Sequence, residues 1–75
     1  MDKREIKNRI EYIVACVTEF ALRFKLTYSQ AYAYLRRFCG IELLIKHYDT
    51  MHTLSIDNAV EDLQIACFNR GGRIV

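Results

Sequence analysis

The stretch "DKREIKNRIEYIVACVTEFALRF" (residues 2–24) decides the fold that we expect for this chain. Its apolar residues recur in steps of four and three, which is the spacing of one side of an α-helix. These residues are Ile6, Ile10, Ile13, Val17, Phe20 and Phe24. The pattern predicts a helix over residues 2–24, about 30 Å long, which is as long as a small domain is wide.

A capping box follows this segment. Thr27 and Gln30 have the T-x-x-Q spacing at which a threonine side chain and a glutamine side chain bond to each other's backbone N–H groups. The spacing predicts a second helix over residues 28–38. Gly40 is placed to end it in a left-handed conformation.

The rest of the chain also has helical periodicity. Apolar residues predict a helix over residues 41–48, and Ser55 is a suitable N-cap for a last helix over residues 56–69. Residues 70–75 form the predicted tail. Residues 1–75 are therefore expected to form one all-α domain, a compact three- or four-helix bundle with a long N-terminal helix.

Composition limits the class of protein. The chain has 75 residues, 52% of them apolar, and a net charge of +2, which fits a globular domain and does not by itself indicate nucleic-acid binding. It has three widely separated cysteines and no C-x-x-C pair, and no secretory signal or long apolar run opens it. These features favour a cytoplasmic location without disulfides or a membrane span. A domain of this size buries only about 60–65% of its unfolded surface, so a binding partner is the expected additional support.

The segment "KHYDTMHTLS" (residues 46–55) holds both histidines. His47, Asp49 and His52 could be proposed as metal ligands, but their spacing does not match a helical pair and no cysteine is near in sequence. The alternative is that His52 and Thr53 bond to backbone groups at a corner between two helices. We therefore expect no metal and no cofactor.

A cysteine–histidine nucleophile is formally possible from Cys39 or Cys67 with either histidine. Nothing in the sequence places these side chains together, and a chain this short can hardly form a deep pocket. The one glycine pair follows a helix instead of opening one, so there is no phosphate-binding loop. We therefore expect no enzymatic activity and no small-molecule substrate.

The apolar stripe of residues 2–24 is longer than the remaining chain can cover well. We expect its surplus to contact a protein partner or a second copy of the chain. Tyr28 and Tyr32 lie on a neighbouring line of the second helix, where they are either core residues or part of the same contact. The expected contact residues are Ile6, Ile10, Ile13, Val17, Tyr28 and Tyr32.

DNA binding is the alternative. A capped helix, a glycine corner and a second short helix resemble a helix-turn-helix, and Arg36 and Arg37 are available for phosphates. The second helix is mostly apolar, however, whereas a recognition helix presents polar side chains to base edges. Its polar residues are Glu42, Lys46 and His47.

Two motifs carry a resemblance to a known family. The order Tyr48-Asp49-Thr50-Met51-His52-Thr53, followed by Asp62-Leu63, resembles the Y-D-x-L-H-T … D-I pattern of the short bacterial proteins called domain of unknown function 3791. Residues 24–35 resemble the F-x-L-[ST]-x-x-x-A-Y-x-Y-L pattern of the same family. Met51 stands where the family usually has leucine, which is a conservative change.

The resemblance implies a small, all-helical, cytosolic bacterial protein with no established enzymatic activity. Members of the family are often encoded beside a protein that resembles an ADP-ribosyltransferase, which implies an antitoxin or an accessory subunit. We therefore expect a non-enzymatic protein–protein interaction module, with a small DNA-binding regulator as the alternative. The residues expected at the corner are Tyr48, Asp49, His52 and Thr53, either as a structural lock for the last helix or as a contact with a partner.

Overall fold

Helices are the regular elements of the described part of the chain, which is residues 3–38 and 40–72 of a computed structural model, without the side chain of Glu5. The helices are α1 (Lys3–Phe24), α2 (Tyr28–Arg37), α3 (Gly40–Lys46), α4 (Tyr48–Met51) and α5 (Ile56–Asn69). Four of them exceed one turn, and α4 is a single turn. The predicted all-α fold with a long first helix is confirmed.

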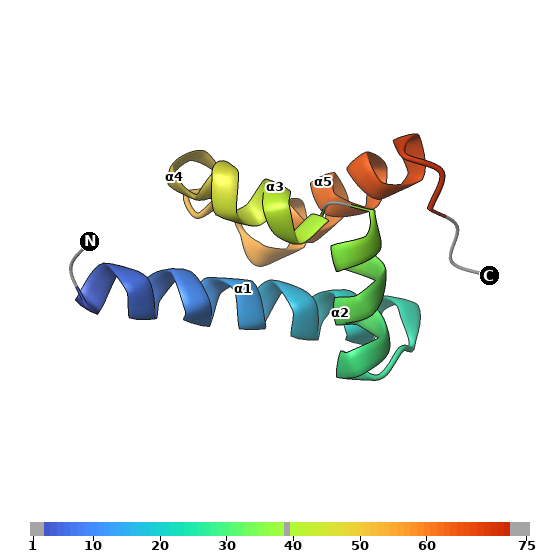
Figure 1. The fold of residues 1–75 in the computed structure, drawn as a ribbon, viewed down its shortest axis with the longest axis horizontal. Coiled ribbons are helices and arrows are strands. Elements are labelled where there is room, and N and C mark those ends of the chain that lie inside the picture. Colours follow the sequence, from blue (N-terminus) through green and yellow to red (C-terminus); the bar gives the residue numbers. More distant parts are fainter. Residues whose placement is uncertain (1–2, 39, 73–75) are drawn as a thin grey trace.

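The helix α1 runs along the length of the molecule (Figure 1). The helix α2 crosses near the C-terminal end of α1, and α3, α4 and α5 form a second layer over one side of α1. The molecule measures 39 × 22 × 21 Å and its radius of gyration is 11.8 Å, close to the value of about 11 Å expected for a compact chain of this length.

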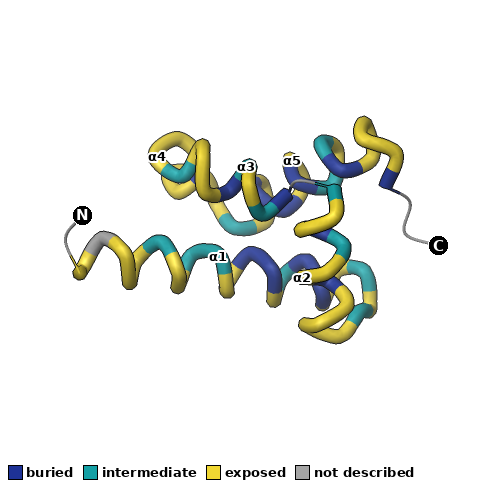
Figure 2. Tube along the Cα trace, in the orientation of Figure 1, coloured by how far each residue is buried: buried dark blue, intermediate teal, exposed yellow. Residues whose placement is uncertain are grey.

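The core lies where the C-terminal half of α1 meets the other helices, and the N-terminal end of α1 is largely exposed (Figure 2). Its buried residues come from every helix: Cys16, Val17, Phe20, Ala21, Ala31, Leu35, Leu44, Met51, Ala59, Val60, Leu63 and Cys67. Aromatic rings extend it, since Phe20 contacts Phe24 and Tyr34 with ring centroids 4.7 Å and 5.6 Å apart. One side of α1 is therefore covered over only part of its length.

The turn between α1 and α2 is fixed by two local motifs. Lys25 has a positive φ of 56°, and Leu26 N–H donates to the carbonyl of Ala21 at 2.8 Å, as in a Schellman C-cap. The predicted capping box then opens α2. Thr27 Oγ1 accepts from Gln30 N–H at 3.1 Å, and Gln30 Oε1 accepts from Thr27 N–H at 2.9 Å.

Gly40 does not have the predicted role. It is the first residue of α3 instead of a left-handed stop for α2, and it is buried. The helix α2 ends at Arg37, and its C-cap Phe38 has an ordinary φ of −103°. A Cβ on Gly40 would lie 2.8 Å from Leu35 Cδ2 and 3.3 Å from Cys67 Sγ. Close packing of three helices therefore explains this glycine, not its backbone angle.

The third predicted helix, over residues 41–48, is also corrected. The helix α3 ends at Lys46, and the backbone of His47, with φ −108° and ψ 23°, separates it from α4. Tyr48 therefore begins a new turn, and "YDTM" is helical although the predicted helix ended at residue 48. Ser55 caps α5 as predicted, because its Oγ accepts from Asn58 N–H at 3.2 Å. Residue 2, Cys39 and residues 73–75 lie outside the described part of the chain.

Candidate functional site

The corner around α4 is built on the ring of Tyr48. The guanidinium of Arg9 lies 4.5 Å from the centroid of this ring. Tyr12 meets it edge-on at 5.5 Å, with an interplanar angle of 86°. The His52 ring stacks on it from within the corner, at 4.6 Å and 5°. Tyr48 is thus enclosed by two residues of α1 and one of its own segment.

Hydrogen bonds complete the corner. Tyr12 donates its hydroxyl hydrogen to the carbonyl of Met51 at 2.9 Å, and this bond joins residues 39 positions apart. Within the corner, His52 Nδ1 bonds to the carbonyl of Tyr48 at 2.7 Å. Thr53 Oγ1 donates to the carbonyl of Thr50 at 2.7 Å. The side chains of His52 and Thr53 therefore satisfy backbone carbonyls at the end of α4, as the structural alternative predicted.

Arg9 adds an ion pair to the same contact. Its Nη2 lies 3.6 Å from Asp49 Oδ1. The Arg9 side chain is only 23% exposed, whereas the Asp49 side chain is 89% exposed. The pair is worth little as a Coulomb attraction in water, so we assign the main contribution of Arg9 to its packing over Tyr48.

Burial disfavours ionisation of two α1 side chains near the corner, Tyr12 and Cys16. It raises the pKa of the Tyr12 phenol above its usual value, and the nearby Cys16, Tyr48 and Asp62 add to this rise. Burial also raises the pKa of the Cys16 thiol. Nucleophilic cysteines have a lowered pKa and are accessible, so this pair is arranged as a neutral part of the core.

The proposed metal ligands point to different partners. Asp49 contacts Arg9, His52 bonds within the corner, and His47 faces a pocket beside α5. Among the residues that the structure describes, no group of three or more His, Cys, Asp or Glu side chains is close enough to hold a metal ion. Cys67, one of the two cysteines considered as a nucleophile, is fully buried, and both histidines are exposed.

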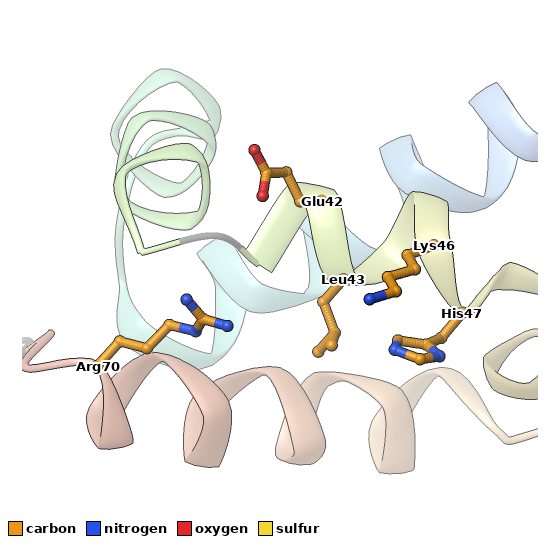
Figure 3. A pocket seen from close by; sticks show the side chains of 5 residues that line it. All are labelled: Glu42, Leu43, Lys46, His47 and Arg70. Atoms are coloured by element: carbon orange, nitrogen blue, oxygen red, sulfur yellow. The ribbon is translucent and has the colours of Figure 1, made fainter.

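A small pocket of about 160 Å³ lies between α3 and α5. Leu43 lines it, and the ends of Lys46 and Arg70 lie on either side of Leu43, with the His47 ring next to Lys46 (Figure 3). The carboxylate of Glu42, the fifth lining residue, points away from Leu43 (Figure 3). The space is thus bordered mainly by cationic or hydrogen-donating groups.

The predicted contact residues separate into two groups. Ile6 and Ile10 of α1 are exposed, at 43% and 56%, and Tyr28 and Tyr32 of α2 are exposed as well. Ile13 is partly buried against the core, and Val17 is fully buried. Including Val17 in a partner contact is therefore wrong, because its side chain belongs to the buried core.

Arg36 and Arg37, the residues of the DNA-binding alternative, are exposed at the end of α2. The Arg37 guanidinium lies 5.6 Å from the centroid of the Phe38 ring. The helix α3, in the position of a recognition helix, has only seven residues and buries Gly40 and Leu44. Its polar side chains Glu42 and Lys46, with His47 directly after the helix, border the pocket described above.

Arg9 and Tyr12 are the residues that sequence reasoning missed at the corner. They lie three positions apart on a line beside the apolar stripe, and Cys16 continues that line four residues later. An arginine and a tyrosine at this spacing share one side of a helix, which is the only local signal for their common role. Val14, 44% exposed, was likewise not included in the expected contact.

No helix in the described part of the chain is long and apolar enough to cross a membrane. Comparison with curated proteins and with solved structures gave no match. A family model described as "Protein of unknown function (DUF3791)" matches residues 11–70. This match contains α2–α5 and most of α1, together with Tyr12, Tyr48 and His52 of the corner, whereas Arg9 lies before it. The chain therefore belongs to the DUF3791 family of proteins of unknown function.

Proposed function

We propose that this chain is a non-enzymatic protein–protein interaction module that binds through the exposed side of α1. The observation that carries the proposal is a row of three exposed apolar side chains, Ile6, Ile10 and Val14, which we call the α1 surface. They are four residues apart, so they lie one above the other along a single side of the helix.

Isolated exposed apolar residues are normal on a protein surface, whereas a contiguous patch marks a contact site. The α1 surface is of the second kind, because its three members are neighbours on one helix. It lies on the N-terminal part of α1, which extends beyond the crossing with α2 (Figure 1). A partner helix or groove could cover it without disturbing the core, in the manner of helix-in-groove recognition.

Tyr28 and Tyr32 support the same proposal from α2. Their rings are nearly parallel, with an interplanar angle of 11° and centroids 6.4 Å apart. Both are exposed, at 43% and 38%. Tyrosine is enriched in protein interfaces because a large apolar ring is combined with a hydroxyl that can remain hydrogen-bonded.

The partner is either a second copy of the chain or another protein. The family resemblance makes an ADP-ribosyltransferase-like protein the first candidate to test, with this chain as its antitoxin or accessory subunit. In either case the bound partner would stabilise the folded domain by mass action.

The test is affinity capture from the native host with the full chain and two variants. Ile10→Asp places a charge in the centre of the α1 surface, and Leu22→Asp makes the same change at a 70% exposed position on another side of α1. We expect a partner that the wild type and Leu22→Asp retain and that Ile10→Asp loses. Equal retention by both variants would remove the α1 surface from the proposal. Light scattering of the purified chain distinguishes self-association from binding to another protein.

A further inference from the structure

The pocket between α3 and α5 is the strongest feature that the proposed function does not use. Its two permanent cations come from different helices: Lys46 is the last residue of α3, and Arg70 is the C-cap of α5. A single basic residue at a helix end is common, because it complements the helix dipole. The helix dipole does not explain why two such residues line one pocket. Lys46 and Arg70 do so, on either side of Leu43 (Figure 3).

The backbone after α5 fixes the position of Arg70. Gly71 has a φ of 89°, its N–H donates to the carbonyl of Phe68 at 3.0 Å, and Gly72 N–H donates to the carbonyl of Cys67 at 2.9 Å. These are the two hydrogen bonds of a Schellman motif. Arg70 therefore projects from a defined helix end and not from an extended tail.

The two cations of the pocket, Lys46 and Arg70, are not paired with a carboxylate of the described chain. The side chains of Lys46 and Arg70 form no ion pair with another residue in ranges 3–38 and 40–72. The carboxylate of Glu42, the one acid of the lining, points away from Leu43 (Figure 3). The pocket thus presents an excess of positive charge and several N–H donors, with Glu42 as the one acid of its lining.

Size and charge together select the ligand. A volume of about 160 Å³ is below the roughly 300–1,000 Å³ of pockets for drug-sized molecules, so it suits one small acidic group. Arginine offers a planar fork for phosphate oxygens and lysine a compact charge. Two such cations and an imidazole around one space match a dianionic tetrahedral group better than a monoanionic carboxylate.

We propose that the pocket of Lys46, His47 and Arg70 binds a phosphate monoester group. The phosphate can be free or carried by a phosphorylated side chain of a protein, and both sources present the same oxygens. The free form is independent of the interaction proposed for the α1 surface. The protein-borne form rests on that interaction and would add a second contact to it.

The test is a titration of the isotope-labelled full chain with inorganic phosphate at constant ionic strength, followed by the backbone amide signals. We expect saturable shifts at residues 42–47 and 70, with a dissociation constant on the order of millimolar. Lys46→Gln/Arg70→Gln should weaken binding at least about tenfold. Lys3→Gln/Arg36→Gln, which removes the same charge from exposed positions elsewhere, should leave it unchanged.

Three outcomes would overturn the proposal. They are shifts that do not saturate up to about 50 mM phosphate, equal weakening by both double variants, and equally tight binding of acetate at the same residues. A short phosphoserine peptide then distinguishes the sources. Tighter binding of the peptide than of inorganic phosphate supports the protein-borne form, and equal binding supports the free form. Because all four substituted side chains are exposed, the amide spectrum of each variant should remain that of the folded chain.

Discussion

Tyr48 connects α1 to the corner through its ring, which is contacted by Arg9, Tyr12 and His52. The ring contacts and the Tyr12–Met51 hydrogen bond hold α4 against the N-terminal half of α1. Aromatic pairs of this kind contribute about 0.5–1.5 kcal/mol beyond the burial of their area. The corner is therefore a structural contact between α1 and α4, and the side chains of His52 and Thr53 bond to its backbone carbonyls.

Tyr12→Phe tests this contact at one atom. The change removes the hydroxyl that donates to Met51 O and keeps the ring against Tyr48. We expect the free energy of unfolding at pH 7 to fall by about 1 kcal/mol, the usual net value of one hydrogen bond. Urea denaturation followed by circular dichroism measures the loss. An unchanged stability would show that the hydrogen bond does not hold α4.

The raised pKa of Tyr12 gives a prediction for alkaline pH. In the unfolded chain a tyrosine ionises near pH 10, whereas burial keeps the folded Tyr12 protonated to higher pH. The stability due to this shift is fully present below pH ~10 and falls as pH rises above it, because the unfolded state releases its proton first. The stability gap between wild type and Tyr12→Phe should therefore narrow above pH ~10. A gap that stays constant up to pH ~11 would contradict the assigned burial.

The sequence predicted half of this corner. His52 and Thr53 were recognisable because they bond to carbonyls three or four residues away, and local spacing encodes such bonds. Arg9 and Tyr12 were not, because their partners lie about 40 positions later in the chain. Only the fold brings these residues together.

At the scale of helices, local motifs were predicted well and close packing was not. The capping box of Thr27 and Gln30 spans three residues and is present as expected. The role of Gly40 depends on Leu35 and Cys67, which belong to two other helices. Its position after α2 therefore suggested a stop signal, although tight packing is the reason for a glycine there.

Gly40→Ala should show that packing. The added Cβ would meet buried atoms of Leu35 and Cys67 at 2.8–3.3 Å. We expect a loss of about 1–3 kcal/mol in the free energy of unfolding, as for other overpacked cores. If backbone freedom were the reason for this glycine, a Gly40→Asn variant, which tolerates left-handed backbone, would retain most of the stability. Equal stability of Gly40→Ala and wild type would contradict the packing explanation.

Lys25 gives a prediction of the opposite sign. It adopts φ 56° at the end of α1, where glycine is the usual residue. Glycine has no Cβ and so avoids the steric cost of this left-handed conformation. We expect this gain to exceed the free-energy cost of ordering a more flexible residue, so Lys25→Gly should stabilise the chain by about 0.5–1 kcal/mol.

Thermal and urea denaturation measure this gain. Lys7→Gly, at an exposed position within α1, is the matched control and should destabilise by about 1 kcal/mol. A loss of stability in both variants would show that the turn after α1 has no strain for glycine to relieve.

In the whole molecule, the core occupies one half of α1 and leaves the other half with an exposed apolar side. The sequence indicated that the stripe is longer than the chain can cover, but it could not show where coverage stops. That limit is set by the positions of α2 and α5, which bury Val17 and leave Ile10 56% exposed. We therefore propose that the corner stabilises the fold and that the α1 surface binds the protein partner.

The most direct test measures binding and stability in the same pair of variants. The captured partner is titrated against Ile10→Asp and His52→Ala, and urea denaturation gives the stability of each. His52 is exposed, so His52→Ala should cost about 0.5–1 kcal/mol of stability and leave the dissociation constant unchanged. Ile10→Asp should keep the stability and weaken binding at least about tenfold. A His52→Ala variant that folds with wild-type stability but fails to bind, beside an Ile10→Asp variant that binds normally, would make the corner the binding site and contradict the account.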